Sequence, residues 1–277
     1  TVIWVAVPLM LIMLAFLVKF GLDYGNTDAV RDYLLSTTRT DFTPQLALVA
    51  LGHAFFTLGV GVGIGIAYGA YAPQRTPLGG SIMTVAIFDT VFAMVAGLAI
   101  YAAVFASNMT PAAGPGLLFI SLPYAFGNLD QGDLAGTVFF ALMAVAALGS
   151  AIAILEAIVA TMKHQFLMQR FTATLLAGAT VWLLSLAVVD SLSPGAGMDW
   201  FGKPNLMSLL DSLTATLLLP LVALLIALFV GWGLRSDILR LELARDSSVF
   251  FSLWRFVLRY IATPAIALLL LIPFYGA

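Results

Sequence analysis

Long apolar runs, separated by short polar segments, are the main pattern along the chain. Seven runs are long enough to cross a bilayer, which takes about 20 consecutive apolar residues in a helix. They cover residues 3–22, 46–71, 81–106, 134–162, 171–192, 206–234 and 249–275. Between them lie polar segments at 23–45, 72–80, 163–170 and 235–248, and a loop with Gly and Pro at 193–205. The pattern predicts an all-α, multi-pass transmembrane helical bundle that forms a single membrane domain over residues 1–277.

A further apolar stretch lies between the third and fourth runs. It covers residues 114–126 and contains both Gly and Pro. An apolar stretch of this length is too short to cross a bilayer and is more typical of a re-entrant or interfacial segment. We therefore expect a re-entrant or interfacial helix here, and not an eighth span.

The composition supports a membrane protein and excludes several other classes. The chain is 62% hydrophobic and 9% charged, whereas soluble domains carry about 25% charged residues. This excludes a soluble enzyme, a disordered tail and a nucleic-acid-binding module, and the net charge of -2 leaves no basic surface for polyanions. The chain has no Cys and only two His, far apart in sequence. Because no nucleophile–base pair or metal cluster appears, we expect no enzymatic activity.

The basic residues are distributed unevenly between alternate loops. Cytoplasmic loops of membrane proteins carry an excess of Lys and Arg. The loops after spans two, four and six, with the start of span seven, hold Arg75, Lys163, Arg170, Arg235, Arg240, Arg245, Arg255 and Arg259. The other side has fewer basic residues beside many Asp. We therefore expect the first span to start in the cytoplasm, and because the chain begins with Thr1 we also expect an amino-terminal part of a longer protein to precede it.

The second span contains a glycine at every second position from Gly59 to Gly65. Each glycine costs about 1 kcal/mol relative to Ala in a helix interior, so four of them together disfavour an uninterrupted helix. One explanation is close helix packing through small residues. The other is a helix broken near residues 58–63, whose freed backbone groups line a polar site. The glycines alone leave both explanations open.

Three polar residues lie within apolar spans. Asp89, in the third span, costs about 2.5–3.5 kcal/mol at membrane depth, so it should face a cavity or a partner. Alternatively its helix starts later than drawn and Asp89 lies near the interface. In the fourth span, we expect Glu156 to pair with a neighbouring helix, and Ser150 to hydrogen-bond its own helix or to face a site.

Several stretches together resemble the neurotransmitter:sodium symporters, particularly their bacterial sodium-dependent amino-acid transporter branch. The likeness keeps its order and spacing across nearly the whole chain, and it rests on residues 52–71, 88–97, 114–123, 146–156, 209–221 and 259–264. It implies a leucine-transporter-type inverted-repeat fold, in which the seven spans look like the family's fifth to eleventh helices and residues 107–126 like its extracellular hairpin. The second repeat would be complete and the first mostly absent, so the missing amino-terminal helices would be partners of this part.

The resemblance also implies roles for particular residues. Phe56, Thr57 and Gly59 match the unwound part of the family's sixth helix, where backbone oxygens receive the substrate amino group. In all, the resemblance implies substrate-binding roles for Phe56, Thr57, Gly59, Val62, Ser150 and Ile154. Positions that match sodium ligands are Thr57 and Asp89 in the first site, and Ala146, Gly149 and Ser150 in the second. Positions that match gates are His53 and Asp211 on the outside and Tyr71 on the inside.

Some positions depart from the family pattern. Gly149 lacks the hydroxyl that the family usually places there, so the second sodium site loses a ligand. His164 stands where an acid of the inner gate is expected, and His53 replaces a Gln beside the outer gate. Ala93 stands where other members carry an acid or a chloride-binding Ser, and Asp89 would supply that negative charge, so we expect no requirement for chloride.

The sequence as a whole predicts a sodium-coupled symporter of amino acids that works by alternating access in the bacterial inner membrane. The small residues Gly59 and Val62 favour apolar or aromatic amino acids as substrates. The alternative is a membrane sensor or subunit that keeps the symporter fold without transport, an interpretation motivated by the changes at Gly149 and His164. The partners that we expect are the amino acid, Na+, the lipid bilayer and the missing amino-terminal helices, and we expect no nucleic acid.

Overall fold

The computed structural model describes residues 2–24, 27–35, 43–73, 76–112, 114–128, 132–192, 205–243 and 247–275. Within these ranges every regular element is a helix. Five helices or continuous helical stretches are long and apolar enough to cross a membrane: Leu78–Ala106, Gly132–Gln165, Arg170–Ser191, Leu206–Gly233 and Ser248–Leu268. The other two predicted spans correspond to α1 (Val2–Tyr24) and to the pair α3 (Pro44–Thr57) and α4 (Ile64–Tyr71).

Contacts between residues divide the chain into two compact units, which are described separately. The first comprises residues 1–41 and 87–152. Its elements are α1, α2 (Thr27–Leu35), most of α5 (Leu78–Ala106), η2 (Leu117–Ser121), α6 (Leu122–Gly127) and most of α7 (Gly132–Gln165). The second unit comprises residues 42–86 and 153–277. Whether the whole chain acts as a single domain stays a prediction.

The core of the first unit joins α1, α5 and the short helix α6. Leu14 and Leu17 of α1 are fully buried, together with Ala99 and Ala103 of α5 and Leu122 of α6. The alanines of α5 let the larger side chains approach its backbone closely, the usual way in which membrane helices pack. This packing fixes the predicted surface segment, where a helical turn from Leu117 leads into α6.

A second helix in this unit lies in a segment that the sequence left as a polar connection. Helix α2 occupies part of residues 23–45, and its Tyr33 packs against two aromatic rings of α5. The ring centroid of Tyr33 is 4.9 Å from that of Tyr101 and 5.6 Å from that of Phe105. Aromatic contacts at these separations stabilise a pair by about 0.5–1.5 kcal/mol. Residues 27–35 of this connection therefore form a short helix held by aromatic packing.

The second unit consists mainly of the later helices. They are α8 (Arg170–Ser191), α9 (Leu206–Leu213), η3 (Thr214–Leu218), α10 (Leu219–Leu228), η4 (Phe229–Gly233), α11 (Ser236–Glu242), α12 (Ser248–Val257), η5 (Leu258–Ala262) and α13 (Thr263–Tyr275). Helix α3 packs against η3, α10 and α13. This contact places α3 beside the middle of the continuous stretch 206–233.

Two wide helical turns in this unit precede prolines. The η3 turn ends two residues before Pro220, and η5 ends two residues before Pro264. Proline has no backbone N–H and clashes with the carbonyl one turn earlier, so the helix must widen locally to continue. At the second turn the Thr263 hydroxyl donates to the Leu258 carbonyl oxygen at 2.6 Å. Both prolines are thereby accommodated without ending the spans.

Candidate functional site

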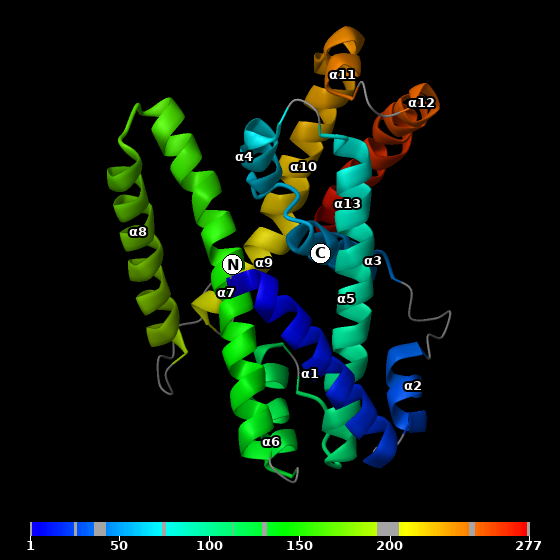
Figure 1. Ribbon diagram of the computed structural model, residues 1–277. Helices are drawn as coiled ribbons and strands as arrows, with labels where there is room; N and C mark the ends of the chain where they lie inside the picture. The colour runs from blue at the N-terminus through cyan, green and yellow to red at the C-terminus, as the bar shows by residue number, and fades with distance from the viewer. Residues whose placement is uncertain are drawn as a thin grey trace. The chain divides into compact units, whose positions relative to one another are not determined.

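The second predicted span is two separate helices (Figure 1). Helix α3 ends at Thr57 and α4 begins at Ile64, and the six residues between them, 58–63, form turns and bends. The interruption lies inside the apolar run 46–71. A non-helical backbone at this depth is tolerated only where it is buried in protein or lines a cavity, so it marks a candidate site.

Three alternating glycines create the interruption. Gly59, Gly61 and Gly63 have φ angles of 66°, 84° and 86°, in the left-handed region. Residues with a Cβ avoid this region, and glycine enters it without steric cost. Gly65, the next in the series, lies in α4 and does not have a positive φ. The spacing of two therefore encodes an alternation of left-handed glycines with valines, and the helix resumes once this alternation stops.

The interruption leaves backbone groups free. The amide of Val60 donates to the Phe55 carbonyl at 2.8 Å, which closes the end of α3. Within the described part of the chain, no backbone N–H reaches the carbonyl oxygens of residues 57–62. Such carbonyls are acceptors for an ammonium group or ligands for a hard cation.

Close packing holds the interruption against the later helices of the same unit. Gly61 lies so near η3–α10 that an added Cβ would be 2.9 Å from the Leu219 carbonyl oxygen. One turn before the end of α3, an added Cβ on Gly52 would collide with the Ala215 carbonyl oxygen. The glycines left two explanations open, a broken helix and close helix packing. Both apply at Gly61, which has a left-handed φ within the interruption and also lies against the Leu219 backbone.

The residues predicted to bind substrate from this span all lie at the interruption. Phe56 and Thr57 are the last two residues of α3, and Gly59 and Val62 lie in the connection. The Phe56 ring is 58% exposed, and the Thr57 hydroxyl donates to the Ala54 carbonyl at 3.2 Å. Phe56 and Thr57 thus present an aromatic face and a hydroxyl oxygen beside the free carbonyls.

The remaining predicted sodium ligands belong to the first unit. Asp89 is half-buried on α5, and since α5 begins at Leu78 the alternative of a late helix start is wrong. On α7, Ala146, Gly149 and Ser150 lie on one helical face, since their spacing is three and four residues. The Ser150 hydroxyl donates to the Ala146 carbonyl at 3.4 Å. That these residues form one site together with the interruption between α3 and α4 stays a prediction.

The predicted outer-gate residues and the pocket-wall residue are exposed in the second unit. His53 lies on α3, Asp211 on α9 and Ile154 on α7, and each side chain is open to its surroundings. None of the three side chains forms a hydrogen bond or an ion pair with another described residue. Their roles as gate and wall therefore stay predictions.

A polar cluster joins three helices at the end of α4. The Tyr71 hydroxyl donates to one carboxylate oxygen of Glu156 at 3.2 Å. Arg170, the first residue of α8, donates to the other oxygen at 2.7 Å. The Glu156 side chain is 17% exposed and that of Arg170 64%. The expectation that Glu156 pairs with a neighbouring helix is confirmed, and its partners include the predicted inner-gate tyrosine.

A cavity of about 270 Å³ adjoins this cluster, between α4 and the end of α7. Tyr71 lines it from α4, and Thr161, His164 and Gln165 line it from α7. Small residues make the space, since Ala67, Ala157 and Ala160 pack against one another where the two helices approach. The structure thus brings together the predicted gate tyrosine and His164, at which the resemblance led us to expect an acid.

Sequence reasoning missed Arg170 as a member of this cluster. It counted Arg170 only as a basic loop residue, whereas α8 begins at this residue and the guanidinium reaches the carboxylate fourteen positions earlier. The available signal was a lone acid deep in one span and a basic residue at the start of the next. The short loop between the two helices allows such a pair to meet.

Comparison with known proteins defines the class to which this architecture belongs. The chain matches the Sodium:neurotransmitter symporter family over residues 1–275. The chain therefore belongs to this family, and it is a multi-pass bacterial membrane protein. The resemblance inferred from the sequence is confirmed.

Particular relatives agree with this assignment. An uncharacterized sodium-dependent transporter of Bacillus subtilis (strain 168), YhdH, is 31% identical over 270 residues, which cover 96% of this chain and 60% of the relative. The sodium-dependent dopamine transporter of Bos taurus is 26% identical and covers 92% of this chain. The chain spans between about half and three fifths of the prokaryotic relatives that it matches.

A solved structure shows the same fold. The crystal structure of MhsT in complex with L-phenylalanine superposes with a TM-score of 0.90 at 34% identity, covering 96% of this chain and 61% of that one. The predicted fold class, a helical bundle of the leucine-transporter type, is confirmed by this match.

Proposed function

We propose that the complete protein is a sodium-coupled symporter of amino acids that works by alternating access. The observation that carries the proposal is the interruption at residues 58–63, where three left-handed glycines leave carbonyl oxygens free inside an apolar span. Membership of a symporter family supports it. Free carbonyls at the midplane suit both an ammonium group and Na+, the two charges that this transport reaction must bind.

The sodium ligands that we propose are oxygen atoms, most of them from uncharged groups. In the first site Thr57 and Asp89 supply a hydroxyl and a carboxylate, and in the second Ala146 supplies a carbonyl and Ser150 a hydroxyl. Gly149 adds no side-chain oxygen to the second site. Hard cations prefer such oxygen ligands. Na+ would then favour one conformation over the other, which is the basis of coupling.

The substrate that we propose is an apolar or aromatic amino acid. The crystal structure of the relative MhsT is a complex with L-phenylalanine. In this chain the positions Gly59 and Val62 at the interruption carry small side chains, beside the Phe56 ring and with Ile154 as a proposed wall. A pocket with small and apolar walls accommodates a bulky apolar side chain and gains by excluding water from it.

The inner gate that we propose is the polar cluster of Tyr71, Glu156 and Arg170. Its hydrogen bonds tie α4 to α7 and α8, in addition to the packing of Ala67 against α7. The adjoining cavity would open as a release path towards the cytoplasm when they break. A short, charge-assisted pair with one exposed partner is stable and still breakable, as a gate requires.

The experiment that tests this function is uptake of radiolabelled amino acids into proteoliposomes that contain the complete gene product. A sodium gradient drives one sample and a matched potassium gradient serves as the control. We expect accumulation only with sodium, strongest for apolar or aromatic amino acids, and lost in Asp89→Ala. A folded protein that accumulates nothing under either cation would favour the alternative, a sensor or subunit without transport.

We also propose that transport does not need chloride, because the carboxylate of Asp89 supplies a negative charge near the position where other members use the anion. Replacing chloride by gluconate should leave the initial uptake rate unchanged. A rate that falls in gluconate and recovers when chloride is returned would contradict this role of Asp89.

A further inference from the structure

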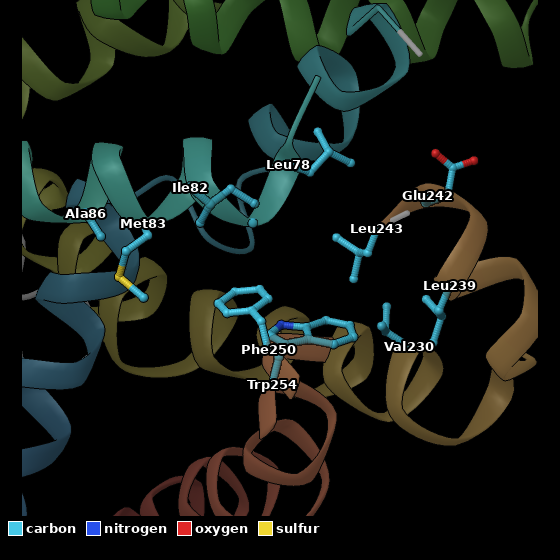
Figure 2. A pocket seen from close by; sticks show the side chains of 11 residues that line it. Leu78, Ile82, Met83, Ala86, Val230, Leu239, Glu242, Leu243, Phe250 and Trp254 are labelled. Carbon is cyan, nitrogen blue, oxygen red and sulfur yellow. The ribbon is translucent and has the colours of Figure 1, made fainter. Parts of the chain in front are cut away.

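A second, larger cavity lies within the second unit, away from the interruption (Figure 2). Its volume is about 400 Å³, and the start of α5, the η4 turn, α11 and α12 all contribute to its walls. The lining includes Leu78, Ile82 and Met83 of α5, Phe250 and Trp254 of α12, and Glu242 of α11. Pockets for small molecules have volumes of about 300–1,000 Å³, so this cavity is within their range.

The walls of this cavity have a definite chemical character. The Phe250 and Trp254 rings line the cavity together with aliphatic side chains (Figure 2). Glu242 is the only ionisable residue of the lining. Its side chain is exposed, and it forms no ion pair with any residue of the described part of the chain. Within the described residues, a carboxylate without an ion-pair partner beside an apolar, aromatic cavity suits a ligand that joins a cation to an apolar body.

The described arginines at α11 and α12 have other partners. Arg240, also on α11, lies over the Phe251 ring with its guanidinium carbon 5.3 Å from the ring centroid. Arg255 donates to the Ser236 hydroxyl oxygen, and Arg235 pairs with Asp237 at 3.2 Å. None of these arginines lines the cavity. Among the described residues, the only charge that the cavity lining presents to a ligand is therefore negative.

We propose that this cavity binds an amphiphilic ammonium compound with an apolar or aromatic body. The body would fill the space among the aliphatic side chains, and the ammonium would lie near the Glu242 carboxylate. Aromatic faces such as those of Phe250 and Trp254 add a favourable interaction with cations. The cavity is on the side predicted to be cytoplasmic, because α5 follows the second span and α11 lies in the loop after the sixth. This site is separate from the proposed transport site and does not depend on it.

Tryptophan fluorescence gives a direct test in the complete gene product, reconstituted in nanodiscs. In this chain of five tryptophans, one variant keeps only Trp254 and a matched variant keeps only Trp182, which is 62% exposed on α8 and reports partitioning into lipid. The probe is ω-bromoundecyl trimethylammonium, whose bromine quenches at short range, and ω-bromoundecanoate is its anionic counterpart. We expect saturable quenching of Trp254 by the ammonium probe at concentrations that hardly affect Trp182.

Two substitutions at the cavity then test the contacts. Glu242→Gln should weaken binding of the ammonium probe about threefold, as for a surface ion pair, while Asp237→Asn, a control on the same helix outside the cavity, leaves it unchanged. Ala86→Phe should fill the cavity and abolish saturable quenching. Equal quenching of Trp254 and Trp182, no quenching of Trp254, or equal affinity for the ammonium and the carboxylate probe would each overturn the proposal. Quenching of Trp254 by a brominated ethanolamine phospholipid alone would also overturn it, because the occupant would then be a bilayer lipid.

Discussion

The alternating glycines allow the origin of the helix interruption to be tested one cause at a time. Four positions separate the two causes, backbone conformation and lack of space. Gly63 has a left-handed φ of 86° and open space around an added Cβ. Gly52 lacks a positive φ, and its Cβ would collide with the Ala215 carbonyl oxygen. Gly61 combines both causes, and Gly65 has neither. Substituting each of the four glycines by Ala therefore tests both causes together, each cause alone, and neither cause.

The magnitudes follow from the two causes. A residue with a Cβ in the left-handed region costs about 1–2 kcal/mol, so Gly63→Ala should lose about that much stability. Crowding a packed region costs about 1–3 kcal/mol, so Gly61→Ala, 2.9 Å from the Leu219 carbonyl oxygen, should lose about 2–5 kcal/mol in all. Gly52→Ala should lose about 1–3 kcal/mol from crowding alone. Gly65→Ala should gain about 0.5–1 kcal/mol, because alanine lowers the entropy of the unfolded chain and favours helix.

Thermal unfolding of the purified variants in one detergent measures these differences. A change of 1 kcal/mol shifts the midpoint by about 2–4 °C for a protein of 150–250 residues. We expect Gly65→Ala above the parent, then Gly63→Ala below it, and Gly61→Ala lowest in the series at the interruption. Equal midpoints for Gly63→Ala and Gly65→Ala would refute the left-handed backbone. Equal midpoints for Gly61→Ala and Gly63→Ala would refute the close approach to Leu219.

Three further predictions concern the gate and the ion sites. Tyr71→Phe should lower stability by about 1 kcal/mol, the value of one hydrogen bond. In a Glu156→Ala background the same substitution should cause no further loss of stability. A double-mutant cycle measures this, and additive effects would contradict a hydrogen bond between Tyr71 and the Glu156 carboxylate. Gly149→Thr should lower the sodium concentration for half-maximal uptake, because it adds a ligand oxygen, whereas Gly149→Ala should not. Similar shifts in both variants would mean that the threonine hydroxyl is not a ligand. Asp89→Asn keeps an oxygen ligand and removes the charge, so uptake should become dependent on chloride, and uptake unchanged in gluconate would exclude that link.

The polar residues show how far local reasoning reaches. For Asp89 the apolar run left two helix starts open, and the observed start at Leu78 selects between them. For Glu156 the depth within a span required a partner, but that partner is Arg170 from the next helix. The cost of an unpaired charge can be read from a sequence. The identity of the partner requires distances between helices, which no periodicity contains.

The sequence by itself determined that the chain is a bundle of membrane helices and that one of them is weakened at residues 59–65. The reason is that lipid offers no hydrogen bonds, so apolar runs of this length must satisfy their backbone groups as helices, and clustered glycines oppose this locally. Only the tertiary structure decided how the backbone at these glycines is arranged and what it packs against. The Leu219 backbone lies against Gly61, so the interruption has no room for a side chain at that position. The cavity beside Glu242 likewise exists because segments far apart in the chain meet there, and such contacts arise only when the helices pack.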